Sequence, residues 1–121
     1  MQRAGTLIIS TTLLVGFALT ITGQGQEKEK IERGVALYTT HKCSQCHSIE
    51  GKPATAVAKK GPLDGVGDKL SEDEIRQWLV DAKGMTAKTK STRKPAMKNY
   101  SKLPKEDVDA LVAYIQSLKK S

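Results

Sequence analysis

Two cysteines three positions apart, with a histidine directly after the second, form the segment Cys43-Ser44-Gln45-Cys46-His47. This spacing is typical of covalent attachment of a c-type haem. Each thiol can add to one vinyl group of the porphyrin, and the imidazole of His47 then lies beneath the iron, where it can bind as an axial ligand. The sequence therefore predicts one haem c per chain, attached through Cys43 and Cys46, with His47 as a metal ligand. A chain with a cofactor fixed in this way must fold around it.

Three other uses of two such cysteines are a redox-active dithiol, a zinc site and a disulfide. A thioredoxin-like dithiol lies in an alternating βαβ pattern, which this sequence lacks. A structural zinc site has four ligands, and the second histidine, His41, is too close to Cys43 to begin a second ligand pair. A disulfide between Cys43 and Cys46 would close a loop so short that it constrains little of the chain. Haem attachment is therefore the working hypothesis, and the three alternatives stay open.

The N-terminal part of the 121-residue chain differs in composition from the rest. Arg3 is followed by an uncharged stretch over residues 4–26, whose most apolar part is residues 7–21. This pattern is typical of a secretory signal, although the stretch is also just long enough for an uncleaved membrane anchor. We predict a signal peptide or anchor over residues 1–25, and one domain over residues 26–121 that is periplasmic or otherwise exported.

Three segments of the domain have the apolar spacing of a helix. The first covers residues 27–40. The second begins at a capping box formed by Ser71 and Glu74 and ends at Gly84. The third begins at Pro104. Proline lacks a backbone N–H, and the first turn of a helix does not need one. We find no β alternation and no internal repeat, so the sequence predicts an all-α domain.

Two long segments, residues 48–69 and 85–103, lack sustained periodicity and contain proline. Irregular segments of about twenty residues are uncommon inside a compact domain. They are expected, however, if each wraps one face of a planar cofactor. We predict that the first segment covers the His47 side of the haem and that the second covers the opposite side.

Taken together, these features resemble a class I cytochrome c. The resemblance covers nearly all of the chain after the signal: the first helix, the Cys-x-x-Cys-His motif, Gly61-Pro62-Leu63-Asp64-Gly65-Val66-Gly67, Pro95-Ala96-Met97 and the last helix. It implies the cytochrome c fold, with three main helices and irregular loops wrapped around one covalently bound haem. It also implies that the first and last helices cross, with Gly34 and Tyr38 meeting residues 111–114.

The resemblance assigns roles to two further residues of the haem site. By analogy with the family, the carbonyl of Pro62 accepts a hydrogen bond from the ring of His47, which would fix the tautomer and raise the basicity of the ligand. Met97 takes the place of the second axial ligand, and a thioether suits the iron of an electron carrier. Met85 is the alternative ligand. Asn99 lies only two residues after Met97, so its hydrogen bond to the sulfur stays open.

The family consists of small electron carriers, so the resemblance implies an exported one-electron carrier and not an enzyme. The alternative is a haem-based gas sensor or a peroxidase-like protein with a labile sixth ligand. The net charge of +7 is concentrated near Met97. The basic residues of that region are Lys83, Lys88, Lys90, Arg93, Lys94, Lys98 and Lys102. Such a surface favours docking to an acidic redox protein. We expect no nucleic-acid partner, because the chain is exported. We also expect a monomer.

Overall fold

The computed structural model describes residues 22–120 of the chain. The predicted signal or anchor over residues 1–25 therefore lies outside the described residues, except for its last four positions. Among the helices of the described part, none is both long and apolar enough to cross a bilayer.

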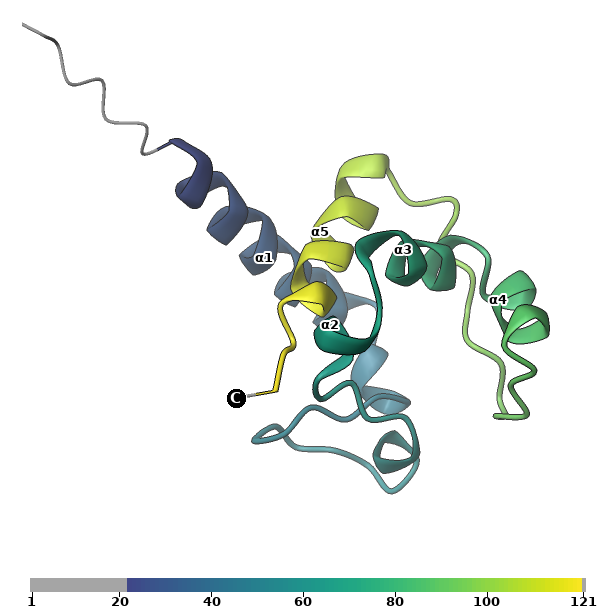
Figure 1. The fold of residues 1–121 in the computed structure, drawn as a ribbon. Helices are drawn as coiled ribbons and strands as arrows, with labels where there is room; N and C mark the ends of the chain where they lie inside the picture. Colours follow the sequence, from purple (N-terminus) through teal and green to yellow (C-terminus); the bar gives the residue numbers. More distant parts are fainter. Residues whose placement is uncertain (1–21, 121) are drawn as a thin grey trace, which may run out of the picture.

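Helices make up all of the regular structure between residues 22 and 120 (Figure 1). The α-helices are α1 (Thr22–Thr40), α2 (Val66–Lys69), α3 (Glu72–Val80), α4 (Ala82–Lys88) and α5 (Lys105–Gln116), and the two 3₁₀ turns are η1 (Cys43–Gln45) and η2 (Ala58–Lys60). No strand is present in this part of the chain. The predicted all-α class is confirmed, and α1, α3 and α5 are its three longest helices.

The crossing of α1 and α5 lies at the centre of the molecule (Figure 1). At the crossing, Gly34 of α1 packs directly on the backbone of Ala110 and on the β-carbon of Tyr114. The rings of Tyr38 and Tyr114 meet edge to face, with their centroids 5.6 Å apart. Because a side chain at position 34 would hold the helices apart, glycine is needed there. The predicted contact of the first and last helices is therefore confirmed.

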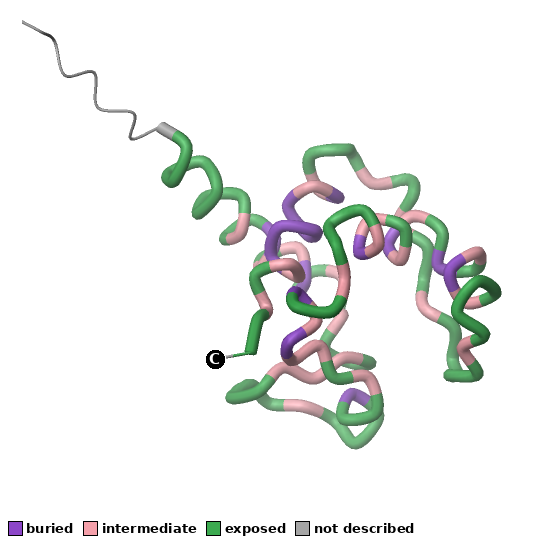
Figure 2. Tube along the Cα trace, in the orientation of Figure 1, coloured by how far each residue is buried: buried purple, intermediate pink, exposed green. Residues whose placement is uncertain are grey.

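The buried core surrounds this crossing and extends along α3 (Figure 2). Its main cluster consists of Tyr38, Ile75, Leu79, Val108, Leu111, Val112 and Tyr114, and Met85 of α4 is also buried. Ion pairs hold the same helices together at the surface, between Arg33 and Asp107 and between Arg76 and Asp109. The helices α1, α3 and α5 therefore form a small apolar core of their own, and the irregular segments connect these helices.

Helix α1 begins five residues before the predicted helix and extends past the core. Residues 23–30 are all exposed (Figure 2). Ion pairs one turn apart, Lys30 with Glu27 and Lys28 with Glu32, support this end of the helix only weakly. The first turns of α1 are thus helical although their side chains are exposed. A helix prediction from buried apolar positions could not include them.

The start of α3 was predicted correctly and its end was not. Ser71 and Glu74 form the complete capping box, with each side chain bonded to the backbone N–H of the other residue. The helix ends at Val80, however, and not at Gly84. The side chain of Asp81 accepts a hydrogen bond from the N–H of Gly84 (3.0 Å) and so caps a new helix, α4. Gly84 lies inside α4, because the cap at Asp81, three residues before it, begins a new helix.

Candidate haem site

The Cys-x-x-Cys-His motif forms one tight turn directly after α1. Lys42 has a left-handed backbone (φ 55°) and turns the chain out of the helix. The carbonyl of Cys43 then accepts hydrogen bonds from the N–H groups of Cys46 (3.1 Å) and His47 (3.0 Å). Cys43 is half-buried and Cys46 is exposed. The turn therefore brings both thiols and the imidazole of His47 together.

The ring of His47 is held by the first irregular segment. Its Nδ1 atom lies 2.9 Å from the carbonyl oxygen of Gly61, to which it donates a hydrogen bond. A proton on Nδ1 leaves the lone pair of Nε2 free. The other ring nitrogen is therefore the one that can bind a metal.

The predicted partner of this ring, the carbonyl of Pro62, is wrong by one residue. The acceptor is Gly61 because its backbone lies directly against the motif. A β-carbon at position 61 would come within 2.5 Å of the carbonyl oxygen of Cys46 and 3.2 Å of the His47 ring. Only glycine fits this space. Pro62 is exposed and follows the contact without making it.

The first irregular segment folds back on itself and so places Gly61. The N–H of Leu63 donates to the carbonyl of Ser48 (2.9 Å), and the carboxylate of Asp64 accepts from the N–H of Glu50 (2.6 Å). These bonds join the beginning of the segment to residues 63 and 64. They thereby place Gly61 next to His47.

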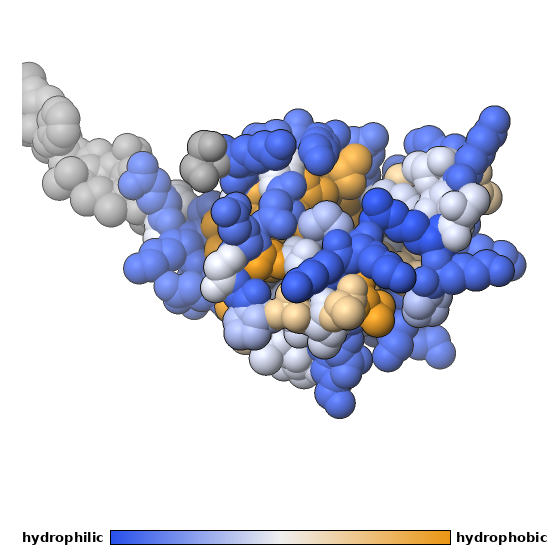
Figure 3. Space-filling view, turned by 90° about the horizontal axis from the view of Figure 1, so that it is seen from below, coloured by the Kyte–Doolittle hydropathy of each residue, from blue (hydrophilic) through white to orange (hydrophobic). Residues whose placement is uncertain are grey.

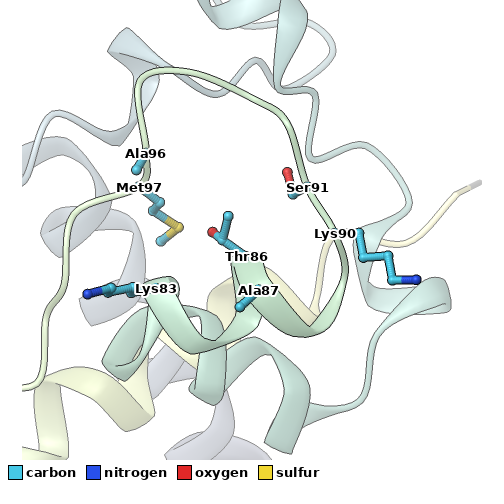
Figure 4. A pocket seen from close by; sticks show the side chains of 7 residues that line it. All are labelled: Lys83, Thr86, Ala87, Lys90, Ser91, Ala96 and Met97. Carbon is cyan, nitrogen blue, oxygen red and sulfur yellow. The ribbon is translucent and has the colours of Figure 1, made fainter.

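Met97 lies in the second irregular segment and is half-buried. It lines an open cavity of about 490 Å³ between this segment and α4. Figure 4 shows the side chains of Met97 and Thr86 directed into the cavity, while Lys83 and Lys90 point away from it. The alternative ligand, Met85, is 5 % exposed on α4 and is part of the core.

Tyr100 connects the Met97 segment to the cysteine motif. Its N–H donates to the carbonyl of Leu79 at 2.7 Å. Its ring meets the ring of His41 edge to face at 5.3 Å, and its hydroxyl lies beside the Cys43 thiol. Burial raises the pKa of the Tyr100 hydroxyl and of the Cys43 thiol. Both groups are therefore protonated near neutral pH.

The sequence reasoning missed Tyr100 and Gly61 as parts of the site. The scarcity of aromatic residues in the domain was the available signal for Tyr100. The side-chain oxygen of Asn99 accepts a hydrogen bond from the N–H of Ser101 (2.8 Å). Only the amide NH2 group of Asn99 could donate to the sulfur of Met97.

Comparison with known proteins decides the family. The family model described as cytochrome c matches residues 31–119, most of the chain. The chain belongs to the cytochrome c family. The predicted fold is thereby confirmed, and this cytochrome is a haem-containing electron-transfer protein. No curated protein and no solved structure matches the chain.

The residues of the site fit a covalently bound haem c. Two free thiols lie on one turn, and the adjacent imidazole has its Nδ1 atom engaged and its Nε2 atom available. When bound, the haem supplies an iron that changes its charge by one electron. Cys43 and Cys46 would hold the porphyrin of this cytochrome, and His47 would hold the iron.

The disulfide and zinc alternatives gain no support from the part of the chain that the structure describes. The thiols of Cys43 and Cys46 are not joined in a disulfide. Across residues 22–120, no group of three or more His, Cys, Asp or Glu side chains is arranged to hold a metal ion. A zinc site has four ligands of this kind.

Proposed function

We propose that this cytochrome is an exported carrier of one electron, with a single haem whose iron is bound by His47 and Met97. The single observation that carries the proposal is the hydrogen bond from the His47 ring to Gly61 (2.9 Å), because it leaves the other ring nitrogen free beside the two attachment cysteines. A partner at Nδ1 fixes the tautomer and makes the imidazole a stronger ligand.

The surroundings of the two methionines favour Met97 as the second ligand. Met97 lies on an irregular segment beside a cavity, whereas Met85 is fixed in the core by α4. A thioether is a soft ligand that raises the potential of the iron. With two protein ligands the iron has no open position for a substrate. We therefore propose that the protein is not an enzyme.

A haem-based gas sensor or peroxidase-like protein is the second candidate. The open cavity beside Met97 favours it, because the volume of about 490 Å³ would allow the thioether to move aside. In such a protein the sixth ligand is labile, and a small molecule replaces it on the iron.

The surface around Met97 indicates the kind of partner. All seven basic residues of the region, from Lys83 to Lys102, are exposed, and residues 82–103 contain no acidic residue. Figure 3 shows a face of the molecule where hydrophilic side chains surround smaller hydrophobic areas. We propose that an acidic redox protein docks against this basic segment, since opposite charge accelerates encounter. The carrier itself acts as a monomer.

Export is proposed from the sequence of residues 1–25. An apolar segment after Arg3 would direct the chain across the membrane to the periplasm or beyond. The alternative of a retained anchor would attach the exposed end of α1 to the bilayer. Both versions place the electron carrier next to membrane or periplasmic redox proteins.

Purification from a host that matures c-type cytochromes tests the function. The intact mass should show one haem on the denatured chain and should reveal whether residues 1–25 are removed. Reduction and oxidation should be reversible in a one-electron titration, and carbon monoxide should not bind the reduced protein near neutral pH. Rapid binding of carbon monoxide would favour the sensor or peroxidase. A denatured chain without haem would exclude the electron carrier as well as the sensor or peroxidase.

A further inference from the structure

The main chain of His47 is bonded to helix α1 as well as to its own turn. The hydroxyl of Tyr38 donates a hydrogen bond to the carbonyl oxygen of His47 at 3.1 Å. Together with the N–H bond to Cys43 (3.0 Å) and the ring bond to Gly61 (2.9 Å), this contact gives His47 three fixed points. Two of the three hold the backbone, and one holds the ring.

The hydroxyl of Tyr38 is not needed for packing. Tyr38 is 6 % exposed, and its ring meets that of Tyr114 at an angle of 79°. A phenylalanine ring would fill the same volume and make the same contact. A buried hydroxyl costs free energy unless it is bonded, and among residues 22–120 the acceptor of this hydroxyl is the carbonyl of His47.

We propose that Tyr38 is a positioning residue for the haem ligand His47. Its hydroxyl holds the backbone of His47 in place, so that the ring stays on the carbonyl of Gly61 and presents its other nitrogen to the iron. The proposal rests on the proposed function, in which His47 is that ligand.

The expected consequence is electronic as well as mechanical. A ring that donates firmly from Nδ1 is more electron-rich and stabilises the oxidised iron. Without the Tyr38 hydroxyl, the backbone of His47 gains freedom and the ring bond to Gly61 weakens. The ring proton should then exchange faster with solvent, and the reduction potential should rise.

The test compares Tyr38→Phe with Tyr114→Phe in the haem-loaded protein. Tyr114 is a matched control, because it belongs to the same ring pair and its hydroxyl bonds to Lys52 (3.0 Å) instead of His47. Exchange of the His47 Nδ1 proton, followed by NMR of the reduced protein, should be about tenfold faster in Tyr38→Phe. The potential should also rise in that variant, and Tyr114→Phe should change neither. Equal behaviour of the two variants in both readouts would overturn the proposal.

A second measurement needs no substitution. In the reduced unmutated protein, the hydroxyl proton of Tyr38 should exchange slowly enough to be observed by NMR. Exchange as fast as that of an exposed tyrosine would overturn the proposal even if Tyr38→Phe failed to fold. Failure of the proposed function is distinguishable, because it would show in the unmutated protein as a spectrum without histidine ligation.

Discussion

The backbone of Gly34 on α1 touches the carbonyl oxygen of Ala110 on α5 so closely that a β-carbon at position 34 would overlap that oxygen. This contact sets the distance between the two helices whose crossing supports the core. The cysteine motif begins where α1 ends, so the same contact also sets the position of the haem site.

Substitution of Gly34 by alanine should strongly destabilise the protein. The β-carbon meets backbone atoms that cannot rotate away, and such overpacking typically costs about 1–3 kcal/mol of the free energy of unfolding. Denaturant unfolding of the haem-loaded protein measures the loss. Ala36→Leu adds more atoms on the exposed side of the same helix and should cost less than about 0.5 kcal/mol. Similar losses in both variants would show that the crossing is not close-packed.

Gly61→Ala should disturb His47 more than Pro62→Ala does. The new methyl group would come within 2.5 Å of the Cys46 carbonyl and 3.2 Å of the His47 ring, so the bond from Nδ1 to Gly61 must lengthen. The reduction potential should rise, because the ring loses its acceptor. Pro62→Ala leaves the acceptor itself in place. A shift in Pro62→Ala that exceeds the shift in Gly61→Ala would restore Pro62 as the partner.

The carboxylate of Asp109 should stabilise the protein only above acidic pH. Its hydrogen bond to Lys105, and then its contact with Arg76, lower the pKa of Asp109. A group whose pKa is lower in the folded state contributes stability above its unfolded pKa of about 3.9 and loses it as the pH falls through the folded value. The unfolding free energies of the wild type and Asp109→Asn should therefore differ at pH 6, and the difference should shrink as the pH falls below the unfolded pKa of about 3.9. A difference that stays constant with pH would show that the ionised carboxylate of Asp109 does not stabilise the folded protein.

The sequence predicted the parts of the fold that local patterns determine. The capping box at Ser71 was recognised because its two partners are three residues apart. The crossing of the first and last helices was implied by the resemblance to the family, and a glycine among the apolar positions of the first helix agrees with it. The end of the second helix was missed, since a side-chain cap at Asp81 outweighs the usual stop at Gly84.

Contacts between distant segments set the limit of prediction at the site. The resemblance to the family implied that the carbonyl of Pro62 meets His47, whereas the carbonyl of Gly61 does so. The backbone angles at Gly61 (φ −124°, ψ 54°) decide which carbonyl it is. The bond from Tyr38 to His47 depends on how the cysteine motif folds back on α1. The contact of Tyr100 with Cys43 depends on the bond that holds Tyr100 to Leu79 of α3. No spacing in the sequence reports those contacts.

The basic segment around Met97 should accelerate electron transfer to an acidic partner. Replacing Lys94 and Lys98 by glutamine should lower the bimolecular rate roughly threefold to tenfold at low salt. It should also flatten the salt dependence, since charges are screened over about 8 Å at 0.15 M ionic strength. Stopped-flow kinetics with the partner gives both quantities. The same change at Lys28 and Lys30, on the exposed end of α1, should have little effect. Equal effects of the two pairs would mean that only the net charge matters.

The ligation of the iron by Met97 is tested most directly by the same substitution at two methionines. Met97→Leu should abolish the iron–methionine charge-transfer band of the oxidised protein, lower the potential and let carbon monoxide bind the reduced iron near neutral pH. Met85→Leu conserves core volume on α4 and should cost less than about 1.5 kcal/mol of stability, with the band intact. A band that survives in Met97→Leu and disappears in Met85→Leu would contradict the account, and a band that survives in both variants would mean that neither methionine is the ligand.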